Sequence, residues 1–168
     1  MRAVAFAVAI IGAVVSSRMP ADASLFAGRN VQAVLDRTLL RQPCSPMNGL
    51  KCYRVPKTIV EGYINTTIVD DGYLANGQEV LIVPLVSGGS GGIFYTLVWT
   101  KISGAWQFVG YIPSGSGHLS VTIEEGSLVV VTPIYASGDA QCCPSGHHNQ
   151  IETLDGIKLR AVESYDTR

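Results

Sequence analysis

From about Thr58 onward, closely spaced turn residues divide the chain into short runs rich in Val, Ile, Thr and Tyr. Glycine follows Asn76, Ser103, Glu125 and Asp155 at the ends of such runs, and pairs of this kind close hairpins. Connections this short make neighbouring strands antiparallel, because a parallel return needs a crossover of a dozen or more residues. The pattern predicts strands over residues 58–69, 79–87, 93–102, 105–112, 118–124, 127–136, 149–154 and 157–163.

One helix is expected ahead of these strands. Val31, Val34 and Leu35 recur at helical spacing, and Asn30 is a suitable N-cap. The helix should end before Pro43, because the residue preceding a proline is pushed out of the helical region. The sequence therefore predicts an α+β fold with one N-terminal helix packed on a meandering antiparallel β-sheet of about six to eight strands.

Pro84 and Pro133 fall inside predicted strands. A proline has no amide hydrogen to donate to a strand ladder, so it is tolerated at an edge or at a bulge. We therefore expect each proline to mark an edge or a bulge of the sheet.

The N-terminal segment has the organisation of a secretory signal peptide. Arg2 supplies the positive charge, Ala3 to Val15 is apolar without interruption, and Ala21-Asp22-Ala23 fits the cleavage rule for small residues. Residues 1–23 are thus the expected signal peptide, and residues 24–168 a single α+β domain. The apolar run is too short to span a bilayer, so we expect an exported, periplasmic or secreted protein with no transmembrane segment in the mature chain. The alternative is an uncleaved membrane anchor.

Charge excludes some partners. The chain has 12 basic and 13 acidic side chains, whereas a nucleic-acid binder needs a basic field that displaces counterions. The chain also has no polybasic cluster of the kind that binds anionic membrane surfaces. We expect neither nucleic acid nor a membrane surface as a partner.

Four cysteines allow three disulfide connectivities. Pro46 and Asn48-Gly49 favour turns that bring Cys44 close to Cys52, which would leave Cys142 and Cys143 for each other. The Cα atoms of adjacent residues are about 3.8 Å apart, below the usual disulfide range that begins near ~4.4 Å, so such a ring is strained and reducible. The rival arrangement links the 44–52 segment to the 142–143 loop twice.

Three pieces of the chain carry a family resemblance: Gly72-Tyr73-Leu74 with Asn76-Gly77, the glycine-rich run Gly88 to Tyr95, and Gly138-Asp139 before Cys142-Cys143-Pro144-Ser145. Through them, the chain from about Gly62 to Leu159 resembles a family of uncharacterised exported bacterial proteins, many of them lipoproteins, with a Gly-Ser-Gly turn and a C-terminal Cys-Cys-Pro motif. The resemblance implies an envelope location and no particular activity. It also implies that the adjacent cysteines form a unit, which favours the pairs Cys44–Cys52 and Cys142–Cys143.

The chain departs from that family in the loop that follows Asp70. A calcium loop places oxygen ligands at alternating positions, but here the alternation is lost at Tyr73, Leu74 and Ala75. We expect a polar hairpin at this point and no metal.

The remaining candidates for chemistry are histidines and cysteines. Cys142, Cys143, His147 and His148 offer ligands for a soft metal, but adjacent residues diverge and do not converge on one ion. His118 is the third histidine, and no nucleophile elbow or papain-like cysteine context accompanies any of the three. We therefore expect no metal, no cofactor and no assigned catalytic residue.

Aromatic residues offer a binding surface instead. Tyr95 and Trp99 share one face of a predicted strand, and Trp106 lies on the next strand. A single helix would leave part of a sheet face uncovered, and exposed aromatic residues are typical of binding surfaces. The alternative is that the rings form the core. The expected binding residues are Tyr95, Trp99, Trp106, Asp139, Cys142, Cys143 and His147.

Together, these features favour an exported, non-enzymatic binding or interaction domain of the cell envelope, with a protein or a small ligand as partner. The alternative is a hydrolytic or redox enzyme that uses His118, His147, His148 or the Cys142–Cys143 pair. A purely structural envelope protein is the third hypothesis.

Overall fold

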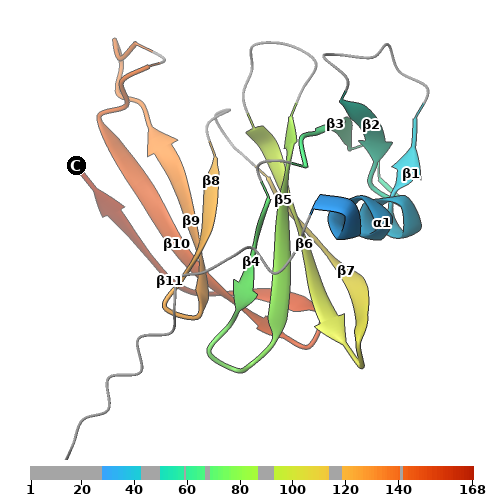
Figure 1. The fold of residues 1–168 in the computed structure, drawn as a ribbon. Helices are drawn as coiled ribbons and strands as arrows, with labels where there is room; N and C mark the ends of the chain where they lie inside the picture. Colours follow the sequence, from blue (N-terminus) through green and yellow to red (C-terminus); the bar gives the residue numbers. More distant parts are fainter. Residues whose placement is uncertain are drawn as a thin grey trace, which may run out of the picture.

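A computed structural model describes residues 28–42, 50–58, 60–66, 69–86, 93–113, 119–140 and 142–168. Within these ranges the chain forms one helix and eleven antiparallel strands (Figure 1), which confirms the α+β fold. The expected signal peptide lies outside the described residues. The elements are α1 (Gly28–Thr38), β1 (Leu40–Arg41), β2 (Lys51–Arg54), β3 (Glu61–Ile64), β4 (Asp70–Tyr73), β5 (Glu79–Val86), β6 (Ile93–Ile102), β7 (Ala105–Pro113), β8 (Ser120–Glu124), β9 (Ser127–Ile134), β10 (Gly146–Asp155) and β11 (Lys158–Thr167).

The described strands form two sheets, not the single meandering sheet that the sequence predicts. The larger sheet has seven strands in the order β1-β2-β3-β5-β6-β7, and β4 also pairs with β5. The smaller sheet has four strands in the order β11-β10-β9-β8. Two sheets are needed because β5 and β6 carry apolar side chains on both of their faces, and one helix covers only one face.

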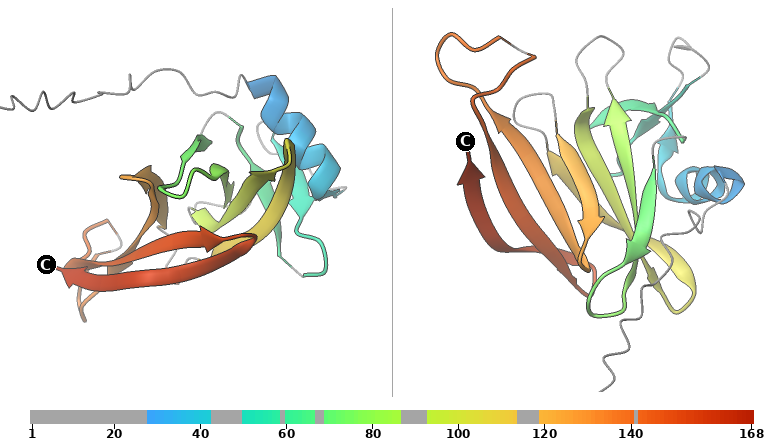
Figure 2. Two further views of the ribbon diagram at one scale, coloured as in Figure 1. Left: turned by 90° about the horizontal axis from the view of Figure 1, so that it is seen from below. Right: turned by 60° about the vertical axis from the view of Figure 1, so that its left-hand side comes forward.

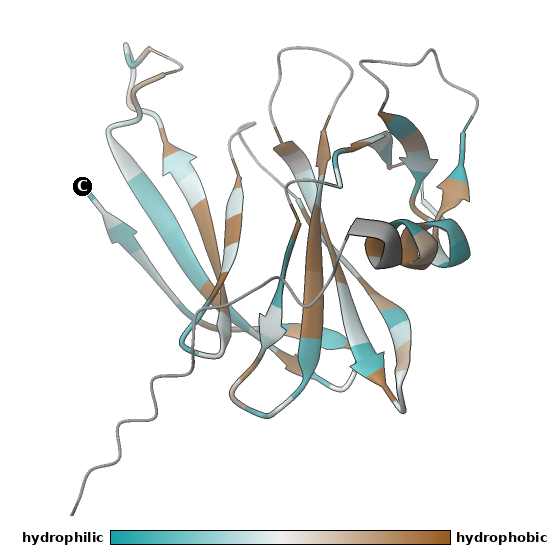
Figure 3. Ribbon diagram, viewed as in Figure 1, coloured by the Kyte–Doolittle hydropathy of each residue, from teal (hydrophilic) through white to brown (hydrophobic). Residues whose placement is uncertain are grey.

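The molecule therefore has three layers, with the seven-stranded sheet between α1 and the four-stranded sheet (Figures 1 and 2). Along β5, Leu81, Val83 and Leu85 belong to the cluster beneath the helix. Val80 and Ile82 belong to the cluster between the sheets. Because both faces are covered, β5 is apolar along nearly its whole length (Figure 3), as strands buried on both sides are.

Three turns hold the sheets together at one end. Ala75 N–H donates to the carbonyl of Gly126 at 2.7 Å. The Asn76 side chain donates to the carbonyl of Leu154 at 2.9 Å, and the Gln78 side chain donates to that of Gly156 at 2.9 Å. These bonds join the β4–β5 turn to the β8–β9 and β10–β11 turns. At this end the sheets converge, and away from it they diverge (Figure 1).

The helix begins earlier than predicted and ends before Pro43, as expected. It begins at Gly28, so Asn30 lies within the helix and is not its N-cap. It ends at Thr38, well before Pro43, because Leu40 and Arg41 pair with Arg54 and Tyr53 of β2. In the described ranges, no helix has the length and apolar character needed to cross a bilayer.

The N-terminal strands are the least well predicted. In the described part of the expected strand 58–69, only β3 is a strand, and β4 begins just beyond it at Asp70. Thr58 itself lies in the β2–β3 turn, where Lys57 has a φ of 63°. The strands β1, β2 and β4 are absent from the sequence prediction. From β5 onward the predicted strands agree with the structure within a few residues, and 93–102 has the same bounds. The polar hairpin predicted around Asn76-Gly77 is confirmed as the β4–β5 hairpin.

The prolines lie where ladders are interrupted. Pro133 is in the part of β9 beyond Val131, where β9 pairs with β10 and no longer with β8, so its expected edge position is confirmed. Pro84 lies in a central strand, between the residues of β5 that pair with β4 and those that pair with β3. A register shift follows it at Leu85.

Candidate functional site

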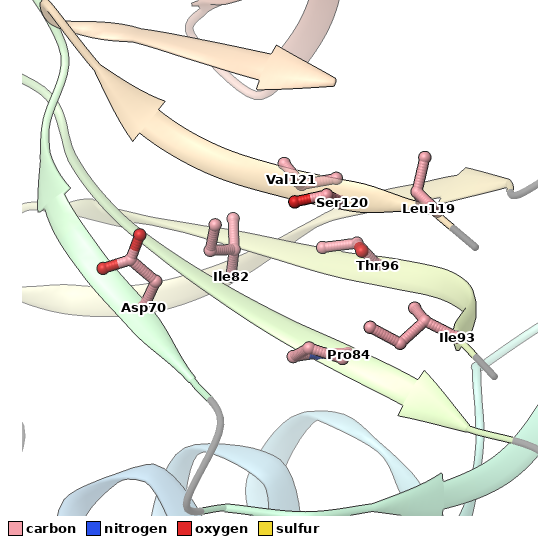
Figure 4. A pocket seen from close by; sticks show the side chains of 8 residues that line it. All are labelled: Asp70, Ile82, Pro84, Ile93, Thr96, Leu119, Ser120 and Val121. Atoms are coloured by element: carbon pink, nitrogen blue, oxygen red, sulfur yellow. The ribbon is translucent and has the colours of Figure 1, made fainter. Parts of the chain in front are cut away.

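Two cavities lie between the sheets. The first has a volume of about 180 Å³ and separates β5 and β6 from β8 (Figure 4). Its walls include Ile82, Pro84, Ile93 and Leu119, and its one carboxylate belongs to Asp70, which is exposed and accepts a hydrogen bond from the next backbone amide. This cavity is therefore mainly apolar, and the carboxylate at its rim already accepts a hydrogen bond.

The second cavity, which we call the Glu152 pocket, has a volume of about 280 Å³. It opens between β7 and the inner face of the four-stranded sheet. This volume is just below the ~300–1,000 Å³ typical of small-molecule sites. Its lining comprises Tyr111, Ile112 and Pro113 of β7, Val130 and Thr132 of β9, His148, Gln150 and Glu152 of β10, and Leu159 of β11.

Glu152 is the buried acid of this pocket. Side chains alternate along a strand, so Glu152 and Gln150 share the inner face of β10 with Leu154, which is part of the core between the sheets. The Glu152 residue is only 8 % exposed. Its Oε1 accepts a hydrogen bond from Gln150 Nε2 at 2.5 Å, and its Oε2 is buried without a hydrogen-bond partner.

Burial raises the pKa of Glu152 above its ordinary value of 4.5, and the hydrogen bond from Gln150 opposes this effect. A buried polar atom without a partner costs free energy, and such atoms are uncommon in folded proteins. The wall of the pocket therefore contains a carboxyl group with one buried oxygen that has no hydrogen-bond partner.

A hydroxyl, an imidazole and a carboxylate lie in register across three strands at the edge of the same pocket. His148 pairs with Thr132 of β9 on one side and with Asp166 of β11 on the other. Its Nδ1 is 2.7 Å from Asp166 Oδ1. This contact orients the ring, and both members of the pair are substantially exposed. The three residues thus place an imidazole that is paired with a carboxylate next to a hydroxyl group.

The predicted aromatic surface is largely core. Trp99 is fully buried under α1, so the expectation that it lies on an exposed binding face is wrong. Trp106 and Tyr95 are half-buried and pack against the same cluster, as the core alternative requires. Tyr95 also makes an edge contact with the ring of Tyr111, with centroids 5.2 Å apart, and Tyr111 is 36 % exposed.

Asp139 organises the loop that carries the adjacent cysteines. Its Oδ2 accepts hydrogen bonds from the amide of Ala136 at 2.7 Å and from the amide and hydroxyl of Ser145 at 2.9 and 2.6 Å. These bonds hold the pKa of Asp139 below its usual value, with the Ser145 hydroxyl as the largest cause. They close the loop between β9 and β10.

Cys142 and Cys143 are exposed thiols on this loop. The hydrogen bond between their side chains raises the pKa of Cys143, which lowers the thiolate fraction and so the reactivity of that thiol. A disulfide between them stays a prediction. Cys52 is buried on β2, and its predicted partner, Cys44, lies outside the described residues, so that pairing also stays a prediction.

His147 and His148 point to opposite faces of β10, because they are adjacent in a strand. His147 is exposed on the outer face and is separated from the Glu152 pocket. His118 is outside the described residues. Across the ranges that the structure covers, no three His, Cys, Asp or Glu side chains are grouped so as to hold a metal ion.

Sequence reasoning missed Glu152. Ile151 and Leu154 are the apolar residues of the predicted strand 149–154, and they lie on opposite faces, so alternation does not reveal which face is buried. One signal in the sequence could have revealed it, because a strand that continues to Leu154 places Gln150 and Glu152 on the same face as the leucine.

The chain matches no protein-family model, no curated protein and no solved structure. Its resemblance to exported bacterial proteins with a Cys-Cys-Pro motif therefore stays a prediction.

Proposed function

We propose that the protein is an exported, non-enzymatic binding domain of the bacterial cell envelope and that the Glu152 pocket is its ligand site. The observation that carries this proposal is the unpartnered Oε2 of a carboxyl group that is 8 % exposed and lines a cavity. An orphaned acceptor of this kind lowers stability, and a binding role explains why the protein retains it. A partner that enters the pocket would satisfy it.

The walls support a small ligand over a protein partner. Ile112, Val130 and Leu159 supply apolar contact, while Thr132, Gln150 and Glu152 supply polar atoms that fix an orientation. A mostly apolar cavity with a few convergent polar groups is the usual composition of a small-molecule site.

The test is a fragment screen by two-dimensional amide NMR with the folded domain. We expect fragments that bind to shift the amides of Val130, Thr132 and Gln150. Thr132→Tyr should abolish these shifts because the ring fills the cavity. The matched control is Thr122→Tyr, at a threonine on β8 that lies on the outer face of the same sheet, opposite in register to Val129. Binding that survives Thr132→Tyr, or shifts confined to other surfaces, would refute the proposed site.

Export is tested separately. The apolar run from Ala3 to Val15 and the Ala21-Asp22-Ala23 site predict cleavage after Ala23. N-terminal sequencing of the protein from the exported fraction should begin at Ser24, and an intact Met1 there would refute the export part of the proposal.

A hydrolytic enzyme is the second candidate, because Asp166 orients His148 beside Thr132 at the pocket edge. In this case His148 would act as a general base. Hydrolysis of p-nitrophenyl acetate by the wild type should then exceed that by His148→Ala by at least about tenfold. Equal rates for the two proteins would reject the enzyme and leave the binding proposal in place.

A further inference from the structure

We infer that the ligand of the Glu152 pocket is a small organic ammonium ion with an apolar body, an inference that rests on the proposed binding function. Its amine end would bond to Glu152, and its apolar body would lie against the aliphatic walls. Three observations support this ligand class.

The first observation is the hydrogen-bonding character of the inner wall. Glu152 Oε2 has no partner, and Gln150 directs its amide nitrogen to Glu152 Oε1, which leaves the Gln150 carbonyl as an acceptor. Thr132 adds a hydroxyl oxygen from the neighbouring strand. An ammonium group carries three donors and no acceptor, so it complements a wall that offers mainly acceptors.

The second observation is charge. The strand neighbours of Glu152 are Leu128 on β9 and Ala161 on β11, and neither can neutralise a carboxylate. The other titratable groups in the pocket lining are His148, which Asp166 already pairs, and the phenol of Tyr111, which has no cationic form. The Lys and Arg side chains in the described ion pairs are engaged elsewhere, with Asp36, Glu61, Glu79 and Asp155. A cationic ligand would therefore be the counter-ion of Glu152, and charge-assisted hydrogen bonds are about twice as strong as neutral ones.

The third observation is size and polarity. A cavity of about 280 Å³ accommodates a ligand of one ring or a short chain. Opposite Glu152, Ile112 of β7 belongs to the apolar core between the sheets, and Leu159 packs against that core. A purely polar cation would lose hydration against these walls without compensation, whereas a cation with an apolar body contacts both parts of the pocket.

The probe is benzylammonium, with benzyl alcohol as its neutral isostere, and the measurement is titration calorimetry at pH 7 supported by amide NMR. We expect benzylammonium to bind the wild type at least tenfold more tightly than benzyl alcohol does. Glu152→Gln should weaken benzylammonium binding at least tenfold and weaken benzyl alcohol binding much less. Glu163→Gln is the matched control, because it removes the same charge from an exposed residue of β11 whose register partner is Ile151, on the outer face of β10.

The outcomes separate the inference from the function on which it rests. If benzyl alcohol binds in the pocket as tightly as benzylammonium, or if Glu152→Gln retains full affinity for the ammonium ion, the ligand class is wrong and the binding function stands. If neither probe nor any fragment shifts the pocket amides, both fail. The comparison of the two probes uses the wild-type protein, so it tests the ligand class even if the Glu152→Gln variant does not fold.

Discussion

The indole of Trp99, on β6 of the seven-stranded sheet, donates a hydrogen bond to the hydroxyl of Thr38, the last residue of α1, at 3.0 Å. That hydroxyl in turn donates to the carbonyl of Val34 at 2.7 Å. The Thr38 hydroxyl thus accepts a hydrogen bond from the buried indole N–H and donates one to a carbonyl in the last turn of the helix. This relay fixes the position of the helix on the sheet.

Thr38→Val should destabilise the protein by about 1–3 kcal/mol, because the indole N–H of Trp99 is left buried without an acceptor. Thr38→Ser retains the hydroxyl and is the control, with a smaller loss. Urea unfolding followed by tryptophan fluorescence measures both. Equal free energies of unfolding for the two variants would show that the relay does not contribute to stability.

Gly126→Ala should disrupt the closed end of the sandwich. Gly126 has a φ of 74°, and a Cβ there would lie 2.6 Å from the backbone nitrogen of Ala75. Gly104 has a φ of 81° with open space around it, so Gly104→Ala isolates the backbone strain of roughly 1–2 kcal/mol. We expect Gly126→Ala to cost at least about 2 kcal/mol more, because a backbone must move. Denaturant melts that gave the two variants equal stability would contradict the close turn contact.

Glu152 should make the protein less stable as the pH rises. Because folding raises the pKa of Glu152, the native state binds protons more readily than the unfolded state does. The contribution of Glu152 to the free energy of unfolding is therefore most favourable below its ordinary pKa of 4.5. The contribution becomes unfavourable as the pH rises from there through the folded pKa. Glu152→Gln removes this dependence. In urea melts at pH 4, 5.5 and 7, the stability of the variant relative to the wild type should increase with pH. A constant difference in the free energy of unfolding would contradict the burial of the acid.

Asp139→Ala should open the loop between β9 and β10 without unfolding the domain. The carboxylate accepts bonds from the amides of Ala136 and Ser145, and hydrogen bonds to charged groups are worth about 1.5–3 kcal/mol. Exchange of these two amides should accelerate by at least about tenfold. Asp155→Ala, at an exposed acid paired with Arg160, is the control and should leave them unchanged. Unaltered exchange in Asp139→Ala would mean that the loop holds its shape by other contacts.

The cysteines are predicted to pair as Cys44–Cys52 and Cys142–Cys143. Adjacent cysteines enclose almost no chain, so Cys142→Ser with Cys143→Ser should unfold within about 1 kcal/mol of the wild type. Cys44→Ser with Cys52→Ser should cost roughly 2 kcal/mol. Denaturant melts compare the two variants, and non-reducing peptide mapping reads the pairing. A peptide that joins the 44–52 region to the 142–143 region would overturn it.

The sequence was sufficient for the hairpins of the C-terminal two-thirds of the chain. Glycine after Asn76, Ser103, Glu125 and Asp155 closes a turn in each predicted place. The reason is local, since positive φ at a glycine and alternation along a strand depend on residues that are close in sequence. Pro133 likewise indicated the edge portion of β9.

The division into two sheets, the burial of Trp99 and the Glu152 pocket were decided by the tertiary structure. Each depends on contacts between distant residues, such as the Asn76–Leu154 bond across 78 positions and the Trp99–Thr38 bond across 61. Alternation separates the two faces of a strand but does not say which face is covered when both carry apolar residues. On β10, the second sheet makes the face of Glu152 an interior one, and that packing turns an ordinary strand glutamate into the buried acid of the candidate site.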